Sequence, residues 1–114
     1  MRYLVGLVFV LAFLLPARTA VAQTAAQIAQ GEKVYVAQKC SPCHAVAGKG
    51  NAKGALDAVG SKLSADEIRQ WIVDAPGMTA KTKAARKPLM KSYPSLAKAD
   101  LDALVAYMQS LKKK

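Results

Sequence analysis

The feature that most constrains this chain is one short segment, Cys40-Ser41-Pro42-Cys43-His44, which holds both of its cysteines and its single histidine. A disulfide across so short a loop adds little chain-entropy stabilisation. A thioredoxin-like redox pair needs a βαβ context, which this chain lacks. A zinc site needs a fourth ligand, and no further Cys or His exists to supply it.

The spacing C-x-x-C-H is that of covalent haem attachment. Two thiols separated by two residues on a helical turn can each add to one haem vinyl group, and the adjacent imidazole then points at the iron. We therefore predict one covalent haem c, bonded to Cys40 and Cys43 and ligated by His44. A chance occurrence of the motif with an ordinary disulfide is the remaining alternative.

The first 22 residues are typical of a secretory signal peptide. Arg2 precedes an apolar run from Tyr3 to Leu15, and Ala20-Val21-Ala22 forms a small-x-small cleavage site. The run is shorter than the roughly 20 residues that a spanning helix needs, which disfavours a membrane anchor. We expect cleavage to leave one periplasmic domain, residues 23–114, without stable membrane insertion.

The charge balance is strongly basic. The chain has 17 Lys and Arg against 7 Asp and Glu, and a net charge of +10. Such a balance favours acidic protein partners. Nucleic acid is a poor candidate for an exported protein without interleaved basic and aromatic residues. The cations near the motif and between residues 81 and 91 are expected to ring an exposed haem edge, unless they only form a solvated surface: Lys39, Lys49, Lys53, Lys81, Lys83, Arg86, Lys87 and Lys91.

The mature chain is predicted to be all-α, because no alternation is long enough for a strand. A first helix is expected over residues 26–39 and a last helix over residues 98–112. Ser64 and Glu67 fit a capping box that begins a middle helix, which Pro76-Gly77 is expected to end. The segments 47–60 and 78–94 are expected to be loops.

The sixth iron ligand is expected to be a methionine, because His44 is the only histidine and thioether ligation is usual in electron-transfer cytochromes. Met108 falls on the apolar stripe of the last helix and is expected in the core. Met90 lies between two prolines and 46 residues after His44, enough chain to return to the opposite face of the haem. We favour Met90 and keep Met78 as the alternative.

The mature chain resembles the class I cytochromes c of the small bacterial kind over nearly its whole length. Gly31 and Tyr35, ahead of the haem motif, resemble the family's first helix, and Leu101-Asp102-Ala103-Leu104-Val105-Ala106-Tyr107-Met108 resembles its last. The resemblance implies three to four helices around the haem, with the terminal helices crossing at Gly31. It also implies that the Trp71 indole can bond a haem propionate, whereas periodicity alone makes Trp71 a core residue.

The sequence departs from the family pattern at two places. The family often has a proline after the haem motif, whose carbonyl accepts the N–H of the axial histidine, and residues 51–56 contain none. A backbone carbonyl of Lys53, Gly54 or Ala55 is expected instead. The ligand methionine is often followed by proline, and here Lys91 follows Met90.

These expectations lead to a monomeric electron carrier that is not an enzyme, because two axial ligands leave no iron position for a substrate. The alternative is a haem-bearing subunit of a periplasmic oxidoreductase complex, for example one that oxidises a sulfur compound. A ligand sensor or peroxidase needs an open iron position, which CO binding by the reduced protein would detect.

Overall fold

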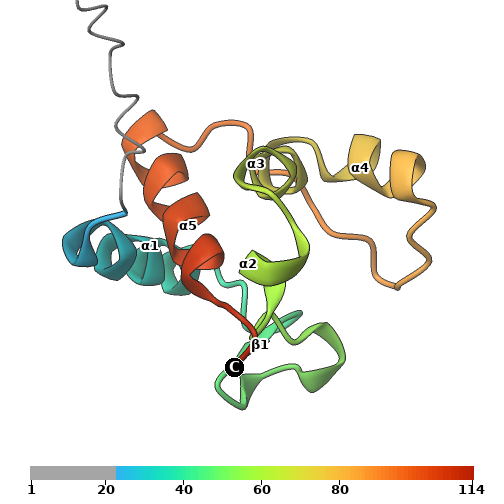
Figure 1. Ribbon diagram of the computed structural model, residues 1–114. Coiled ribbons are helices and arrows are strands. Elements are labelled where there is room, and N and C mark those ends of the chain that lie inside the picture. The colour runs from blue at the N-terminus through green and yellow to red at the C-terminus, as the bar shows by residue number, and fades with distance from the viewer. Residues whose placement is uncertain (1–22) are drawn as a thin grey trace, which may run out of the picture.

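The computed structural model describes residues 23–114, and the predicted signal peptide lies outside these described residues. The described part is mostly helical (Figure 1). None of its helices is long and apolar enough to cross a membrane. The elements in chain order are α1 (Ala25–Ala37), β1 (Ala45–Val46), β2 (Lys49–Gly50), the 3-10 helix η1 (Ala52–Gly54), α2 (Val59–Lys62), α3 (Ala65–Val73), α4 (Ala75–Thr82) and α5 (Lys98–Ser110).

The terminal helices α1 and α5 cross at Gly31, as the family resemblance implied. A Cβ on Gly31 would collide with the backbone carbonyl of Ala103 and lie 2.6 Å from Cβ of Tyr107. Only glycine at position 31 therefore permits α1 and α5 to pack this closely. Beside the crossing, the rings of Tyr35 and Tyr107 meet edge to face, with centroids 5.9 Å apart and planes at 69°.

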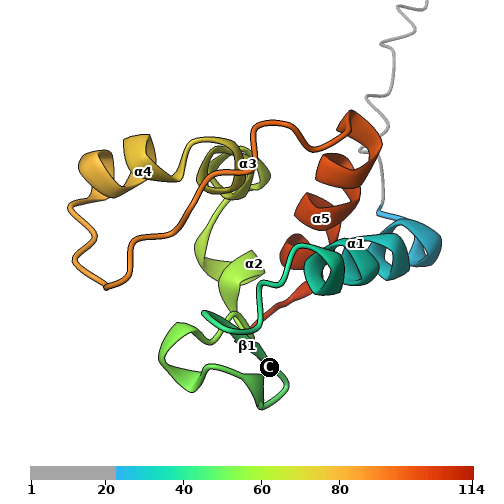
Figure 2. The same cartoon turned by 180° about the vertical axis from the view of Figure 1, so that it is seen from behind.

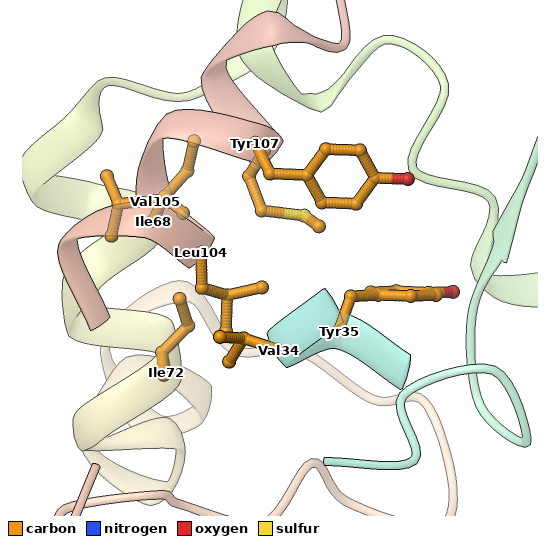
Figure 3. Close-up of a cluster of buried hydrophobic side chains, with 8 residues drawn as sticks. Val34, Tyr35, Ile68, Ile72, Leu104, Val105 and Tyr107 are labelled. Atoms are coloured by element: carbon orange, nitrogen blue, oxygen red, sulfur yellow. The ribbon is translucent and has the colours of Figure 1, made fainter. Parts of the chain in front are cut away.

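The core lies where α1, α3 and α5 meet (Figure 3). Each of these helices supplies one face, because residues three and four apart lie on the same side of a helix. Trp71, which periodicity alone makes a core residue, is only half-buried. The buried cluster consists of Val34, Tyr35, Ile68, Ile72, Leu104, Val105, Tyr107 and Met108.

The predicted capping box begins α3. The Ser64 hydroxyl accepts from the Glu67 amide at 3.2 Å, and the Glu67 carboxylate accepts from the Ser64 amide at 2.8 Å. These two bonds satisfy donors that the first turn of a helix otherwise leaves unpaired.

The predicted end of this helix was wrong. Helix α3 ends at Val73, and Pro76-Gly77 lies in the first turn of α4. Proline is tolerated there because the first N–H groups of a helix have no intrahelical partner. The Asp74 carboxylate caps the new helix by accepting from the Gly77 amide at 3.1 Å. The expected loop therefore begins only after Thr82, and Met78 is helical.

Two smaller differences concern the predicted loops and the last helix. Residues 47–60 contain β2 and η1, and the two-residue strands pair antiparallel, Ala45 with Gly50 and Val46 with Lys49. Helix α5 stops at Ser110, two residues earlier than expected. Beyond it, the Lys113 amide donates to the Ser61 hydroxyl at 2.8 Å, so the C-terminal segment runs along α2.

Helix α3 lies between α5 and α4 in both views of the ribbon (Figures 1 and 2). The segment that joins α4 to α5 loops away from α4 and then returns past α3 to α5 (Figure 2). This segment contains Met90, so the predicted ligand lies on the stretch of chain that returns past α3.

Candidate functional site

The C-x-x-C-H segment forms a tight turn directly after α1. Lys39 has a φ of 54°, and this left-handed residue redirects the chain. The amides of Cys43 and His44 both donate to the Cys40 carbonyl, at 3.1 and 2.9 Å. The Tyr35 hydroxyl donates to the His44 carbonyl at 3.3 Å, which ties the turn to the α1–α5 crossing. Both thiols and the imidazole consequently line one cavity.

The His44 ring is held in one tautomer. Its Nδ1 lies 2.9 Å from the Gly54 carbonyl oxygen, which can only accept, so Nδ1 carries the proton. Burial lowers the pKa of His44, and the positive charge of Arg86 adds to this effect although the Gly54 bond opposes it. A neutral ring with a protonated Nδ1 leaves Nε2 free to bind a metal. Of the three carbonyls expected from the sequence, the structure selects Gly54.

The two cysteines are free thiols in the structure. Burial and then the neighbouring Cys43 raise the pKa of Cys40 to about 11, although the positive charge of Lys91 opposes them. Redox-active pairs instead depend on a lowered thiol pKa. Among residues 23–114, moreover, no cluster of three or more His, Cys, Asp or Glu side chains is placed to hold a metal ion. The raised pKa of Cys40 therefore disfavours a dithiol oxidoreductase.

The cavity next to the turn has a volume of about 540 Å³. Pockets of about 300–1,000 Å³ with apolar walls are typical of cofactor sites. Helices α2, α3 and α5 supply the walls, chiefly with Val59, Leu63, Ile68, Trp71, Ile72, Leu104 and Met108. Two thiols, a neutral imidazole and a thioether open onto this apolar space, and that set of donors fits a covalently attached haem.

The three methionines of the described chain occupy different environments. Met90 is half-buried in the segment after α4, and its side chain lines the cavity with Cys40, Cys43 and His44. Met78 is 5 % exposed on α4 and does not line the cavity. Met108 lines the cavity but belongs to the core cluster, as expected. The placement favours Met90 over Met78, and the ligand assignment stays a prediction.

The Trp71 side chain is half-buried and lines the cavity from α3. Both readings of this residue remain compatible with the structure, because its neighbours Ile68 and Ile72 are in the core. The bond between its indole and a propionate stays a prediction.

Sequence reasoning expected Arg86 only as one of the cations near the haem edge and missed its contact with the haem-attachment turn. Its guanidinium lines the cavity and donates to the Cys43 carbonyl at 2.6 Å. No local pattern could have revealed a contact between residues 43 positions apart. Two other cations, Lys39 and Lys91, also line the cavity, and all eight cations expected near the haem edge are exposed.

Comparison with known proteins gives one family. The family model for cytochrome c matches residues 28–112. Cytochrome c oxidase subunit 2 of Alkalihalophilus pseudofirmus is 29 % identical over 92 residues, which cover 73 % of this chain and 25 % of the relative. The chain thus spans about a quarter of the length of this curated relative. No solved structure matches.

Proposed function

We propose that this chain, which belongs to the cytochrome c family and has its all-α fold, carries single electrons in the periplasm between redox partners. The family implies covalently bound haem c and a role in electron transfer. The observation that carries the finer proposal is the shared cavity, where Cys40, Cys43 and His44 face the same space as Met90.

Each residue of the site has a defined task in this proposal. Cys40 and Cys43 would hold one haem through thioether bonds, and His44 and Met90 would ligate its iron. The bound haem supplies the Fe(III)/Fe(II) couple. The apolar walls keep water away, and the Gly54 carbonyl orients His44 and increases its basicity. With His44 and Met90 both bound to the iron, the protein would leave no position for a substrate, which favours a carrier over an enzyme.

The location and the partners follow from residues outside the cavity. The signal-like segment 1–22 supports export to the periplasm. The exposed cations near the cavity support acidic redox proteins as electron donor and acceptor. Size favours a monomer that docks transiently with each partner.

A second candidate is a haem-bearing electron-transfer subunit of an oxidoreductase complex. The likeness to part of a cytochrome c oxidase subunit favours it, because domains of this kind also occur within larger electron-transfer proteins. Purification from periplasm separates the two candidates: a carrier elutes alone, and a subunit elutes in a stable complex.

Haem staining after denaturing electrophoresis tests the attachment. The mature band should stain, and the double variant Cys40→Ala, Cys43→Ala should not. A stained band from the double variant would defeat the assignment.

The axial ligand is tested by near-infrared absorption of the oxidised protein. Met90→Ala should remove the weak band of sulfur-to-iron ligation and lower the reduction potential. Met78→Ala is the matched control. It should keep the band but lower the stability by about 2–4 kcal/mol, because it empties a buried site on α4. The reverse result would move the ligand to Met78.

A further inference from the structure

The segment that carries Met90 has few attachments to the rest of the protein. At its start, the Ala84 amide donates to the Thr79 carbonyl at 3.1 Å. At its far side, the Ser92 hydroxyl accepts from the Ala75 amide at 3.0 Å, and the Tyr93 amide donates to the Ile72 carbonyl at 2.7 Å. In the described chain, residues 87–91 make no hydrogen bond. Met90 therefore lies in a span that is held by no hydrogen bond of its own.

Among residues 23–114, Arg86 makes the one hydrogen bond between this segment and the haem-attachment turn. Its Nη2 donates to the Cys43 carbonyl at 2.6 Å. A bond from a charged donor is shorter and stronger than one between neutral groups, and the planar guanidinium fixes its direction. The bond thus joins the segment that carries the predicted distal ligand to the turn that carries the proximal one.

Gly54, at the end of η1, leaves room for this guanidinium beside the attachment turn. A Cβ at Gly54 would collide with the Cys43 carbonyl and with Nη1 of Arg86. The same residue holds the His44 ring through its carbonyl. The absence of a side chain at Gly54 therefore makes room for Arg86 beside the bond that orients His44.

We propose that Arg86 is a positioning residue, which holds the Met90 segment closed against the attachment turn. This inference rests on the proposed function, in which Met90 is the distal ligand. Without the Arg86 bond, the span between Ala84 and Ser92 keeps attachments only at its two ends. Met90 then leaves the iron more often, although the ligand itself and the proximal side are unchanged.

Imidazole binding to the oxidised holoprotein measures this opening. An external ligand binds only when Met90 has moved away, so its apparent affinity scales with the open fraction. Arg86→Ala should bind imidazole roughly fivefold to tenfold more tightly. This factor corresponds to the free energy that one charge-assisted hydrogen bond at the surface contributes to the closed state. Lys87→Ala is the matched control, since it removes a neighbouring exposed charge that makes no hydrogen bond in the described chain. Equal gains in both variants would overturn the proposal.

The same substitution in a Met90→Ala background shows whether Arg86 acts through Met90. With no methionine to displace, Arg86→Ala should leave the imidazole affinity unchanged. An equal gain in both backgrounds would mean that Arg86 acts on imidazole itself, and the positioning role would be wrong. Arg86→Leu, which keeps an aliphatic stem, repeats the comparison if the alanine variant folds poorly.

These outcomes are distinguishable from failure of the proposed function. If Met90→Ala alone keeps the sulfur-to-iron band, the ligand assignment is wrong, and the role of Arg86 falls with it. If Met90→Ala loses the band and Arg86→Ala binds imidazole as the parent protein does, only the role of Arg86 is refuted.

Discussion

His44 Nδ1 donates its hydrogen bond to the carbonyl oxygen of Gly54, 2.9 Å away and ten residues further along the chain. The carbonyl belongs to the last residue of η1, and the Asn51 side chain begins that element by accepting from the Lys53 amide at 3.0 Å. A short turn built from local contacts thus fixes the orientation of the ring, the task that a proline carbonyl often performs in the family.

Gly54→Ala should disturb the proximal side of the site. The new methyl group meets the Cys43 backbone, which must shift, so the stability should fall by about 1–3 kcal/mol. A weaker bond to Nδ1 makes the imidazole less basic, and the reduction potential should rise. Both quantities can be measured by denaturant unfolding and spectroelectrochemistry.

Gly48→Ala is the control for this substitution. Gly48 has a φ of +76° and open space around its Cα, so alanine there costs conformational strain of roughly 1–2 kcal/mol. Its potential should not change. A shift of the potential by the same amount in both variants would show that Gly54 has no special role.

Gly31→Ala should destabilise the protein although alanine is the better helix former. By propensity alone, the change would stabilise α1 by about 1 kcal/mol. The added Cβ instead collides with the Ala103 carbonyl, so we expect a net loss of about 1–3 kcal/mol in thermal or denaturant unfolding. Ala29→Gly at an exposed position of the same helix should cost about 1 kcal/mol. A stabilised Gly31→Ala protein would contradict the close crossing.

The docking proposal predicts that cations near the cavity matter more than distant ones. Changing Lys83, Lys87 and Lys91 to Glu should slow electron transfer with an acidic partner by roughly tenfold or more at low salt, without changing the haem spectrum. The effect should shrink as salt rises, because exposed charges are screened over about 8–10 Å.

The control for docking is a triple change at Lys62, Lys113 and Lys114, which alters the net charge equally. Lys112 is left intact because its Nζ donates to the Gly60 carbonyl at 2.6 Å and supports the C-terminal segment. Stopped-flow rates should fall much less in this control. If the rates of the two triple variants fall equally, net charge alone attracts the protein to its acidic partner, and the cations near the cavity have no special role.

Asp102 should contribute to stability in a pH-dependent way. Hydrogen bonds from Lys98 and then Arg69 lower the pKa of this carboxyl below its ordinary value of 3.8. Because the folded state holds the ionised form, the contribution is present above that value and disappears as the pH falls through the lower folded value. Asp102→Asn should cost about 0.5 kcal/mol at pH 7, a typical figure for a surface pair. Unfolding curves of both proteins should converge near pH 2, and a constant difference would argue against the ion pairs.

The sequence alone determined the features that depend on neighbours in the chain. The C-x-x-C-H spacing places two thiols and an imidazole on one turn, whatever the tertiary structure around that turn. The Ser64–Glu67 capping box begins α3 with bonds across three residues. The stripe on α5 marked its buried face, because helical periodicity is set by the backbone itself.

The tertiary structure decided what depends on residues far apart. Pro76-Gly77 suits either the end or the start of a helix, and Asp74 selected the start by capping α4. Of three candidate carbonyls, the geometry of η1 brought Gly54 to His44. The Arg86 bond to Cys43 and the burial of Met78 on α4 left no trace in any local pattern. They arise only when the chain after α4 returns to the attachment turn, since long-range packing is a property of the whole fold.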